Sequence, residues 1–331
     1  MNFLRPILAL LVIAGAIAFT GKYSEHHTAD NVFSQLFTHL MPARLVQLPD
    51  GAMSMDGEPA ADSQGEEGHA RAHSLISSPL PAALGIVDPA YHAGGEVGPE
   101  LFMTNLQVFQ IASVLLIFIL LGGIPTYLRT GRGDYLTRLF TGFSMYIRDE
   151  MVVPVMGKQT ANKYLPFFLG IFFFILFMNV MGLVPGSATA TASIFVTGAL
   201  AVITFMAMVI CGMVVQGPVA FWKNLVPHVP LVLWPLMFLV EVVGLFVKPF
   251  ALMIRLFANM TGGHLVVLSF MGLIFFFTQS LSDGAGWGSS PVAVAFAVFI
   301  MIIEAFVAML QAYIFTQLSI LFVNSSIHPE H

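Results

Sequence analysis

Long apolar stretches separated by short polar segments make up most of the sequence beyond residue 100. Three of them, residues 106–128, 165–183 and 191–215, are close to the roughly 20 residues that a helix needs to cross a bilayer. Asn162 is the expected start of the second stretch, and the Pro-Gly pair at 185 its stop. The pattern predicts three membrane-spanning helices.

Two further apolar stretches, residues 228–278 and 292–323, are too long for upright helices. They would form helices of about 75 Å and 48 Å, against an apolar slab of about 30 Å. Either the first stretch breaks near Pro249 or near Thr261-Gly262-Gly263, or both stretches lie strongly tilted. A proline need only kink a helix, and the glycine pair offers no polar loop. We therefore expect two long, tilted helices that form a hairpin.

The turn of this hairpin is expected in the polar segment 279–290. Ser290 is then the N-cap of the last helix and Pro291 its first residue, positions that these residue types favour.

An amphipathic segment follows the first span. Its apolar residues recur near helical spacing at Tyr135, Leu136, Leu139, Phe140, Phe143 and Tyr146, among Arg129, Arg132, Arg138 and Arg148. We interpret it as a helix on the membrane surface, with a solvated loop helix as the alternative. The expected fold class is an all-α membrane protein with about five membrane-embedded helices plus this surface helix.

The first hundred residues differ from the rest. Residues 6–19 are apolar and follow Arg5, which is typical of a targeting segment or a peripheral anchor; they are short for a span. Residues 50–100 are rich in Pro, Gly, Ser, Ala and acids, as in a solvated extension. We expect an extension over residues 1–100 and a membrane domain over residues 101–331.

Composition supports a membrane class. The chain has 331 residues, 57% of them hydrophobic and 9% charged, with a mean hydropathy of +0.85. Its single cysteine, Cys211, excludes an intrachain disulfide and a cysteine metal cage. No basic patch of a size that suits nucleic acid is present, so nucleic acid is not an expected partner.

Charge also predicts orientation. Residues 1–100 have a formal net charge of −7 and residues 101–331 a net charge of +2. The arginines after the first span and Lys223 lie in loops expected on one side, which the positive-inside rule assigns to the matrix or cytoplasm. The acidic extension then lies on the opposite side, and the carboxyl end lies inside.

Four ionisable residues and one histidine interrupt the last two stretches. Glu241, Lys248 and Arg255 are seven residues apart, so they form one stripe on a helix, with neighbours about 10 Å apart along the axis. Arg255 cannot lose its proton, and such a residue in mid-membrane costs roughly 2.5–3.5 kcal/mol. It therefore needs water or a buried partner, which makes it a functional candidate.

Other polar residues extend this arrangement. Asn259 lies about 40° from Arg255, whereas His264 lies about 180° from it on a continuous helix. Glu304 and Gln311 are seven residues apart and share a face of the last helix.

Structural alternatives exist for most of these residues. Glu241 and Lys248 are also compatible with simple packing or with snorkelling at an interface, and Asn179, Asn259 and Gln311 with interhelical hydrogen bonds. His264 is also compatible with a neutral interior histidine. His264 and Glu304 together would offer a metal only two ligands, which is a weak case.

Three strings carry a resemblance to a known family. They are NVMGLVPG from Asn179, PFALMIRLFANMTGGH from Pro249 and LQAYIF from Leu310. In their order and spacing, over roughly residues 100–325, they resemble the a subunit of F-type ATP synthases. Met253 departs from the small residue usual there. The long amino-terminal part resembles the mitochondrial type of some green algae.

The resemblance implies roles for the candidate residues. Arg255 would be the stator arginine that faces the ring of c subunits, and His264 with Glu304 would line the inlet half-channel. Asn259 and Gln311 would flank the arginine, and we place Glu241 in the same proton path.

The resemblance also implies partners and a location. Expected partners are the c-subunit ring, the peripheral stalk and other membrane subunits, the lipid bilayer and a dimer partner, with no cofactor. The implied location is the mitochondrial inner membrane, with the extension in the intermembrane space and the carboxyl end in the matrix. No ATP chemistry is expected, because the sequence has no GxxxxGK phosphate loop.

Two other classes stay open. A secondary transporter or channel should show internally similar halves with matching broken helices, and no such repeat is seen in the sequence. A structural anchor of a respiratory complex would tolerate neutral replacement of Arg255 and Glu304.

Overall fold

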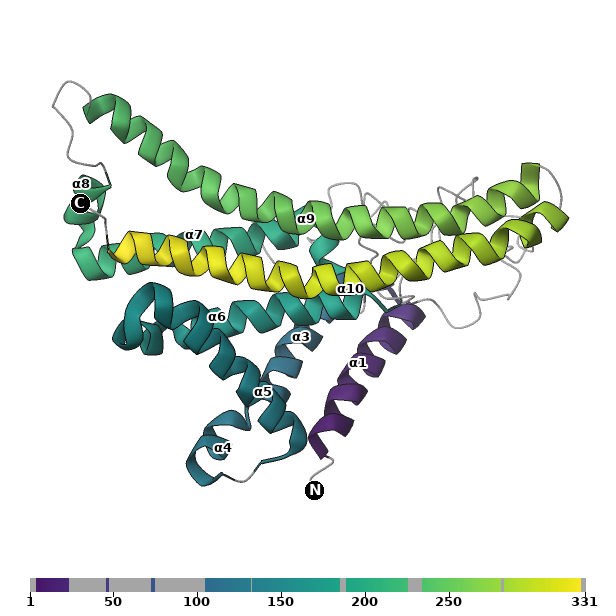
Figure 1. The fold of residues 1–331 in the computed structure, drawn as a ribbon, viewed down its shortest axis with the longest axis horizontal. Helices are drawn as coiled ribbons and strands as arrows, with labels where there is room; N and C mark the ends of the chain where they lie inside the picture. Colours follow the sequence, from purple (N-terminus) through teal and green to yellow (C-terminus); the bar gives the residue numbers. More distant parts are fainter. Residues whose placement is uncertain are drawn as a thin grey trace.

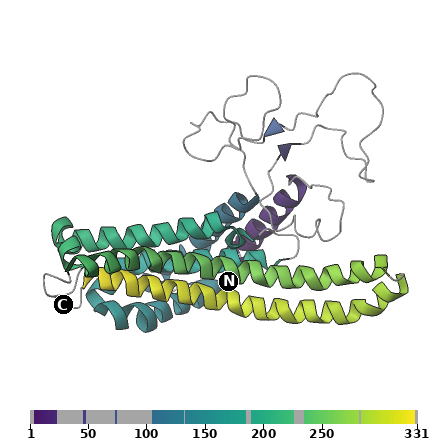
Figure 2. The same ribbon diagram turned by 90° about the horizontal axis from the view of Figure 1, so that it is seen from above.

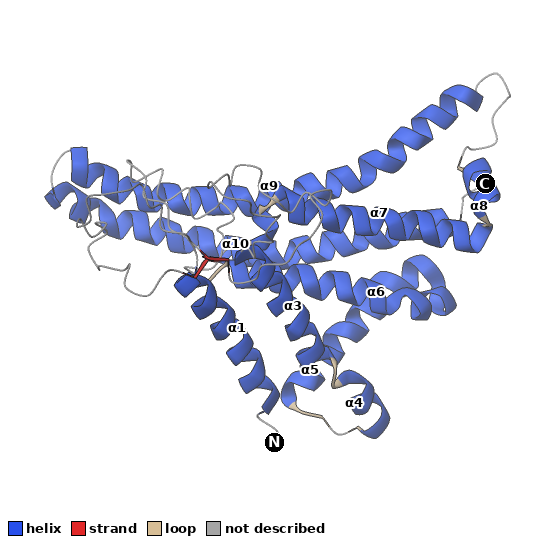
Figure 3. Cartoon of the chain, turned by 180° about the vertical axis from the view of Figure 1, so that it is seen from behind, coloured by secondary structure: helices blue, strands red, loops and turns tan. Residues whose placement is uncertain are grey.

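The computed structural model describes residues 4–23, 46–47, 73–74, 105–131, 133–184, 189–225, 234–280 and 283–328. Most of the predicted solvated extension, residues 50–100, lies outside these ranges. Two short strands, β1 (Val46–Gln47) and β2 (His73–Ser74), pair antiparallel. Nearly everything else that is described is helical (Figure 3).

The helices follow one another as shown in Figure 1. They are α1 (Leu4–Tyr23), α3 (Asn105–Leu121), α4 (Ile124–Thr130), α5 (Tyr135–Tyr146), α6 (Val153–Gly182), α7 (Ile194–Gln216), α8 (Pro218–Asn224), α9 (Trp234–Ser280) and α10 (Asp283–Ile327). A π-helical segment, Ile147–Val152, joins α5 to α6, and a 3₁₀ turn, Ala190–Ala192, precedes α7.

Five helical segments in the described part of the chain are long and apolar enough to cross a membrane. They are Leu106–Thr130, Tyr135–Gly182, Ile194–Gln216, Trp234–Ser280 and Gly286–Ile327. This confirms the predicted all-α membrane class with about five embedded helices.

The last two helices form the predicted hairpin. α9 and α10 run side by side over the carboxyl-terminal part of α9 (Figures 1 and 2), whereas the amino-terminal part of α9 turns away from α10 (Figures 1 and 3). Neither Pro249 nor the Gly262-Gly263 pair breaks α9, which is continuous over 47 residues. Small buried residues on α10, Ala308 and Ala312 among them, favour close approach of neighbouring helices.

The predicted turn of the hairpin is wrong. α9 continues to Ser280 and α10 begins at Asp283, so Ser290 and Pro291 lie inside α10 instead of at its start. The reason is close contact between the two helix ends. A Cβ atom at Gly286 would collide with the Thr278 hydroxyl, so only a glycine lets the first turns of α10 approach α9 there.

The predicted start of the second span is also wrong. α6 begins at Val153, and Asn162 lies within it on an exposed face. The chain kinks at Gly157, where φ is 72° and ψ is 159°. A glycine adopts this conformation without steric cost, so helical structure can lie on both sides of the kink.

The amino-terminal helices stack on the bundle. α1 packs along α3, and Arg5 Nη1 donates a hydrogen bond of 2.7 Å to Thr137 Oγ1 on α5. This contact is expected of an anchor helix. α5 buries Thr137, Thr141 and Ser144 and exposes Tyr135, Leu139 and Tyr146.

A buried asparagine links three elements near the centre of the bundle. Asn179 Nδ2 on α6 donates to the Ala308 carbonyl of α10 at 3.3 Å, and Asn179 Oδ1 accepts from Thr191 Oγ1 at 2.7 Å. Asn179 and Thr191 are fully buried. The interhelical alternative considered for Asn179 is thus what the structure shows, and it fixes α6 against α10.

We expect Asn179→Ala to lower the free energy of unfolding by about 1–2 kcal/mol, because it leaves the buried Thr191 hydroxyl without its partner. Asn162→Ala, on the exposed face of the same helix, is the matched control and should change little. Thermal unfolding of the two variants in detergent measures this; equal midpoints would contradict the structural role of Asn179.

Candidate functional site: a buried carboxylate, a histidine and an exposed arginine

A polar cluster lies where α9 and α10 meet the chain after α6. His264 Nδ1 on α9 is 3.4 Å from Glu304 Oε1 on α10. Its other ring nitrogen, Nε2, forms a hydrogen bond with Thr189 Oγ1. Thr189 Oγ1 in turn lies 3.2 Å from the Gly182 carbonyl at the end of α6. Three segments far apart in sequence thus place their polar atoms in one cluster.

The carboxylate of this cluster is almost completely enclosed. The Glu304 side chain is 4% exposed and that of His264 is 18% exposed. Glu304 Oε1 makes no hydrogen bond with the described residues, and its ion-pair contact among them is with His264 Nδ1. A buried carboxylate held by one imidazole can exchange a proton with it.

Two glycines make the close contacts of the cluster sterically feasible. A Cβ at Gly263 would lie 2.7 Å from Glu304 Oε1, and one at Gly182 would lie 2.6 Å from Thr189 Oγ1. Both distances are too short for real side-chain atoms. Gly263 therefore lets α10 bring its carboxylate against the backbone of α9.

Thr189, Gly182 and Gly263 were missed as members of the site by sequence reasoning. Gly263 was considered only as part of a break in the helix. The available signal was the position of a glycine directly beside a histidine inside an apolar helix.

Arg255 lies elsewhere on α9. It is exposed, as is Asn259 one turn later, and neither joins the His264 cluster. Nine residues separate Arg255 from His264, which is about 13 Å along the axis. Within the part of the chain that the structure describes, Arg255 has no hydrogen bond or ion pair.

The remaining members of the charged stripe are half-buried. Lys248 Nζ lies 5.7 Å from the centroid of the Phe322 ring on α10, a cation–π distance. No ion pair joins Glu241 to Lys248 among the described residues, as expected from their axial separation. The packing interpretation therefore suits Lys248.

Glu304 and Gln311 share the buried face of α10, as predicted. Both side chains are 4% exposed, and the fully buried Ala308 lies between them. Gln311 therefore faces the interior of the bundle at the level between Glu304 and the carboxyl-terminal turns of α10.

No group of three or more His, Cys, Asp or Glu residues that could hold a metal ion occurs among the described residues. His264 and Glu304 supply two ligands, whereas catalytic zinc sites in proteins use three protein ligands. The geometry offers proton exchange between two titratable groups more directly than metal binding.

The fold and this cluster together define a multi-pass membrane protein with ionisable groups inside its helix bundle. The family model for the ATP synthase A chain matches residues 107–324. That is more than half of the chain, which therefore belongs to the ATP synthase A chain family.

Similar proteins come from bacteria. The chain is 44% identical over 187 residues to an ATP synthase subunit a of Myxococcus xanthus, covering 56% of this chain and 59% of that protein. It is 33% identical over 320 residues to an ATP synthase subunit a 2 of Prosthecochloris aestuarii, covering 91% of this chain and 95% of that protein.

The aligned region spans less than two thirds of several of these relatives, such as 55% of an ATP synthase subunit a of an Anaeromyxobacter species. The Prosthecochloris alignment, in contrast, must reach into the first hundred residues. A long amino-terminal part thus occurs in a bacterial relative, and the expected mitochondrial, green-algal type has no support from these proteins.

We expect Gly263→Ala to displace the Glu304 carboxylate from His264 and to lower the free energy of unfolding by about 1–3 kcal/mol, through overpacking. Gly262→Ala is the matched control, since a Cβ at Gly262 would meet nothing within 4 Å. Thermal unfolding in detergent compares the two variants. If Gly262→Ala destabilises the protein as much as Gly263→Ala does, the close approach of Glu304 is not what requires a glycine.

Proposed function

We propose that this chain is the proton-translocating stator subunit of a rotary ATP synthase. It provides two aqueous half-channels to and from a ring of c subunits, with Arg255 between them. The observation that carries the proposal is an exposed arginine in the middle of a 47-residue apolar helix, with a buried carboxylate–histidine pair near it on the same hairpin. Family membership supports the same assignment.

Arg255 acts electrostatically. A guanidinium exposed at this depth costs several kcal/mol in lipid unless an opposite charge or water meets it. The proposed partner is a carboxylate on a c subunit, which the exposed face of α9 meets as the ring rotates. Arg255 attracts that carboxylate in its deprotonated form. As a permanent cation it also repels protons that would leak straight across the membrane. Each leaked proton would dissipate about 2.3 kcal/mol of free energy per 100 mV of membrane potential.

The His264–Glu304 pair forms the inlet. A hydroxyl has one hydrogen, so when Thr189 Oγ1 donates to the Gly182 carbonyl it accepts from His264 Nε2. The position between His264 Nδ1 and Glu304 Oε1 is then where a proton in transit is held, on either group. From there it passes to the c-subunit carboxylate, which becomes neutral and can enter lipid.

The other polar candidates extend the path. Asn259 is exposed one turn after Arg255 and polarises the same surface, and Gln311 continues the buried polar face of α10 beyond Glu304. Glu241 is half-buried near the start of α9. Along the helix axis it lies before Arg255, whereas His264 lies after it. This position suits the outlet.

The proposed surroundings follow from family and charge. Residues 101–331 form the membrane domain and residues 1–100 an extension whose acidic part, residues 50–100, lies on the outer side, with the carboxyl end inside. The contact of Arg5 with Thr137 puts the start of α1 near the inner-side arginines. The bacterial relatives favour a bacterial membrane over a mitochondrial one. Partners are the c ring, the peripheral stalk and other membrane subunits; a dimer partner stays a prediction. ATP chemistry belongs to other subunits.

The competing classes fit less well. A transporter built from repeats should show a second long hairpin, and the described helices before α9 contain no counterpart of α9–α10. A structural anchor has no use for an enclosed carboxylate, which is costly to keep.

Arg255→Ala should reduce ATP synthesis to background while the complex still assembles, because nothing then attracts the c-subunit carboxylate. Acid–base driven ATP synthesis in membrane vesicles and co-purification of the subunits measure the two properties. Arg138→Ala, an exposed arginine on α5, is the control and should keep synthesis. Normal ATP-driven proton pumping in Arg255→Ala would falsify the stator role.

Glu304→Gln should slow proton uptake by about 10²- to 10⁴-fold with assembly retained, because the amide can no longer relay a proton. ATP-driven acidification of vesicles gives the rate. Glu150→Gln, on an exposed part of the π-helical segment, serves as control. Equal rates in wild type and Glu304→Gln would remove this residue from the path.

A further inference from the structure

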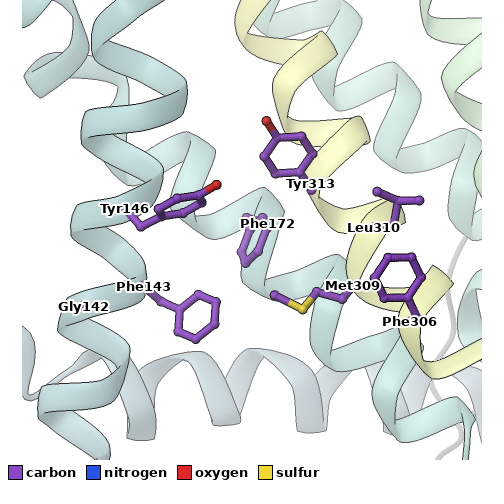
Figure 4. A pocket seen from close by; sticks show the side chains of 8 residues that line it. All are labelled: Gly142, Phe143, Tyr146, Phe172, Phe306, Met309, Leu310 and Tyr313. Carbon is purple, nitrogen blue, oxygen red and sulfur yellow. The ribbon is translucent and has the colours of Figure 1, made fainter. Parts of the chain in front are cut away.

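A pocket of about 470 Å³ lies between α5, α6 and α10, apart from the His264 cluster (Figure 4). Gly142, Phe143 and Tyr146 come from α5, and Phe172 comes from α6. Four side chains of α10, from Phe306 to Tyr313, complete the wall. All the lining side chains are apolar except for the two tyrosine hydroxyls. No residue of the proposed proton path lines this pocket.

The position and shape of the pocket select a long apolar occupant with a polar end. Its walls belong to segments apolar enough to cross a membrane, and its rim is open, since Phe306 is 68% and Tyr146 53% exposed. Water is a poor occupant, because a water site needs 2–4 polar partners. Figure 4 shows Tyr146 and Tyr313 toward one end and Phe143 and Phe306 toward the other. The volume is within the roughly 300–1,000 Å³ of small-ligand sites.

Charge around the pocket favours an anionic occupant. Residues 124–163 contain six basic and three acidic residues. Lys158 and Lys163 are exposed on α6 and precede Phe172. Because α6 runs antiparallel to α10, with Asn179 bonded to Ala308, these two lysines lie toward the Tyr313 end of the pocket. Basic clusters beside membrane helices attract anionic lipid head groups.

We propose that this pocket binds one acyl chain of an anionic phospholipid. The tyrosine hydroxyls donate hydrogen bonds to ester or phosphate oxygens of the lipid, and the basic segment attracts its head group. The lipid fills the gap between α5 and the hairpin, so it is a bound structural ligand of the membrane domain. This inference is independent of the proton path and stands even where the stator role fails.

The test uses the assembled complex in vesicles that contain phosphatidylglycerol with a photoreactive acyl chain. A parallel set contains phosphatidylcholine with the same photoreactive chain. After illumination, the labelled peptides are identified by mass spectrometry. We expect labelling of α5 near Phe143 and of α10 near Met309, stronger for phosphatidylglycerol.

Gly142→Leu fills the pocket, since a Cβ at Gly142 would meet nothing within 4 Å and the position lines the pocket. It should lower the labelling about tenfold, the loss expected when about two CH₂ groups of the chain can no longer be buried. Gly170→Leu on α6 is the matched control, because its Cβ also has open space and it does not line the pocket. Thermal unfolding midpoints of both variants confirm that each is folded.

Each other outcome overturns the proposal. Equal labelling of Gly142→Leu and Gly170→Leu would show that the lipid lies outside the pocket. Equal labelling by the two head groups would remove the anionic preference. Absence of lipid labels, together with cross-links from Gly142→Cys to another subunit, would show that a protein helix fills the site.

Discussion

The cost of an ionisable group away from water is the constraint on which this structure depends. A bundle this apolar can retain a carboxylate only if another polar group meets it. Glu304 satisfies this requirement through His264, and His264 through Thr189. These contacts join α10, α9 and the chain after α6, so the position of the hairpin relative to the bundle is coupled to the polar site.

Small residues make this arrangement geometrically feasible. In lipid, helices gain little from the hydrophobic effect and associate through close contact and hydrogen bonds. Gly263 and Gly182 leave room for the polar side chains opposite them, and Ala308 lets the Asn179 amide reach its carbonyl. Gly263, which looks like part of a helix break in the sequence, serves here as a point of close approach within a continuous helix.

The hairpin thereby has two chemically different regions. At one level it encloses the His264–Glu304 pair between helices, and about 13 Å away along α9 it exposes Arg255 on a surface with large apolar side chains such as Phe250 and Ile254. An enclosed group that exchanges protons and an exposed fixed cation suit a device that passes protons to an external acidic group. The proposed lipid pocket beside α5 would serve stability and not transport.

The sequence by itself determined the class of protein, the helical hairpin and the charged residues worth attention. Apolar length, the helical period and the cost of a buried charge act locally along the chain, so Arg255, Glu304 and the shared face of Glu304 and Gln311 could be predicted from spacing. The starts of α6 and α10 were misplaced because helix ends depend on contacts with other helices, as at Gly286 against Thr278. Only the tertiary structure decided which polar groups meet: Thr189 reaches His264 across 75 positions of sequence, and no local pattern encodes which distant side chain fills the space that a glycine leaves.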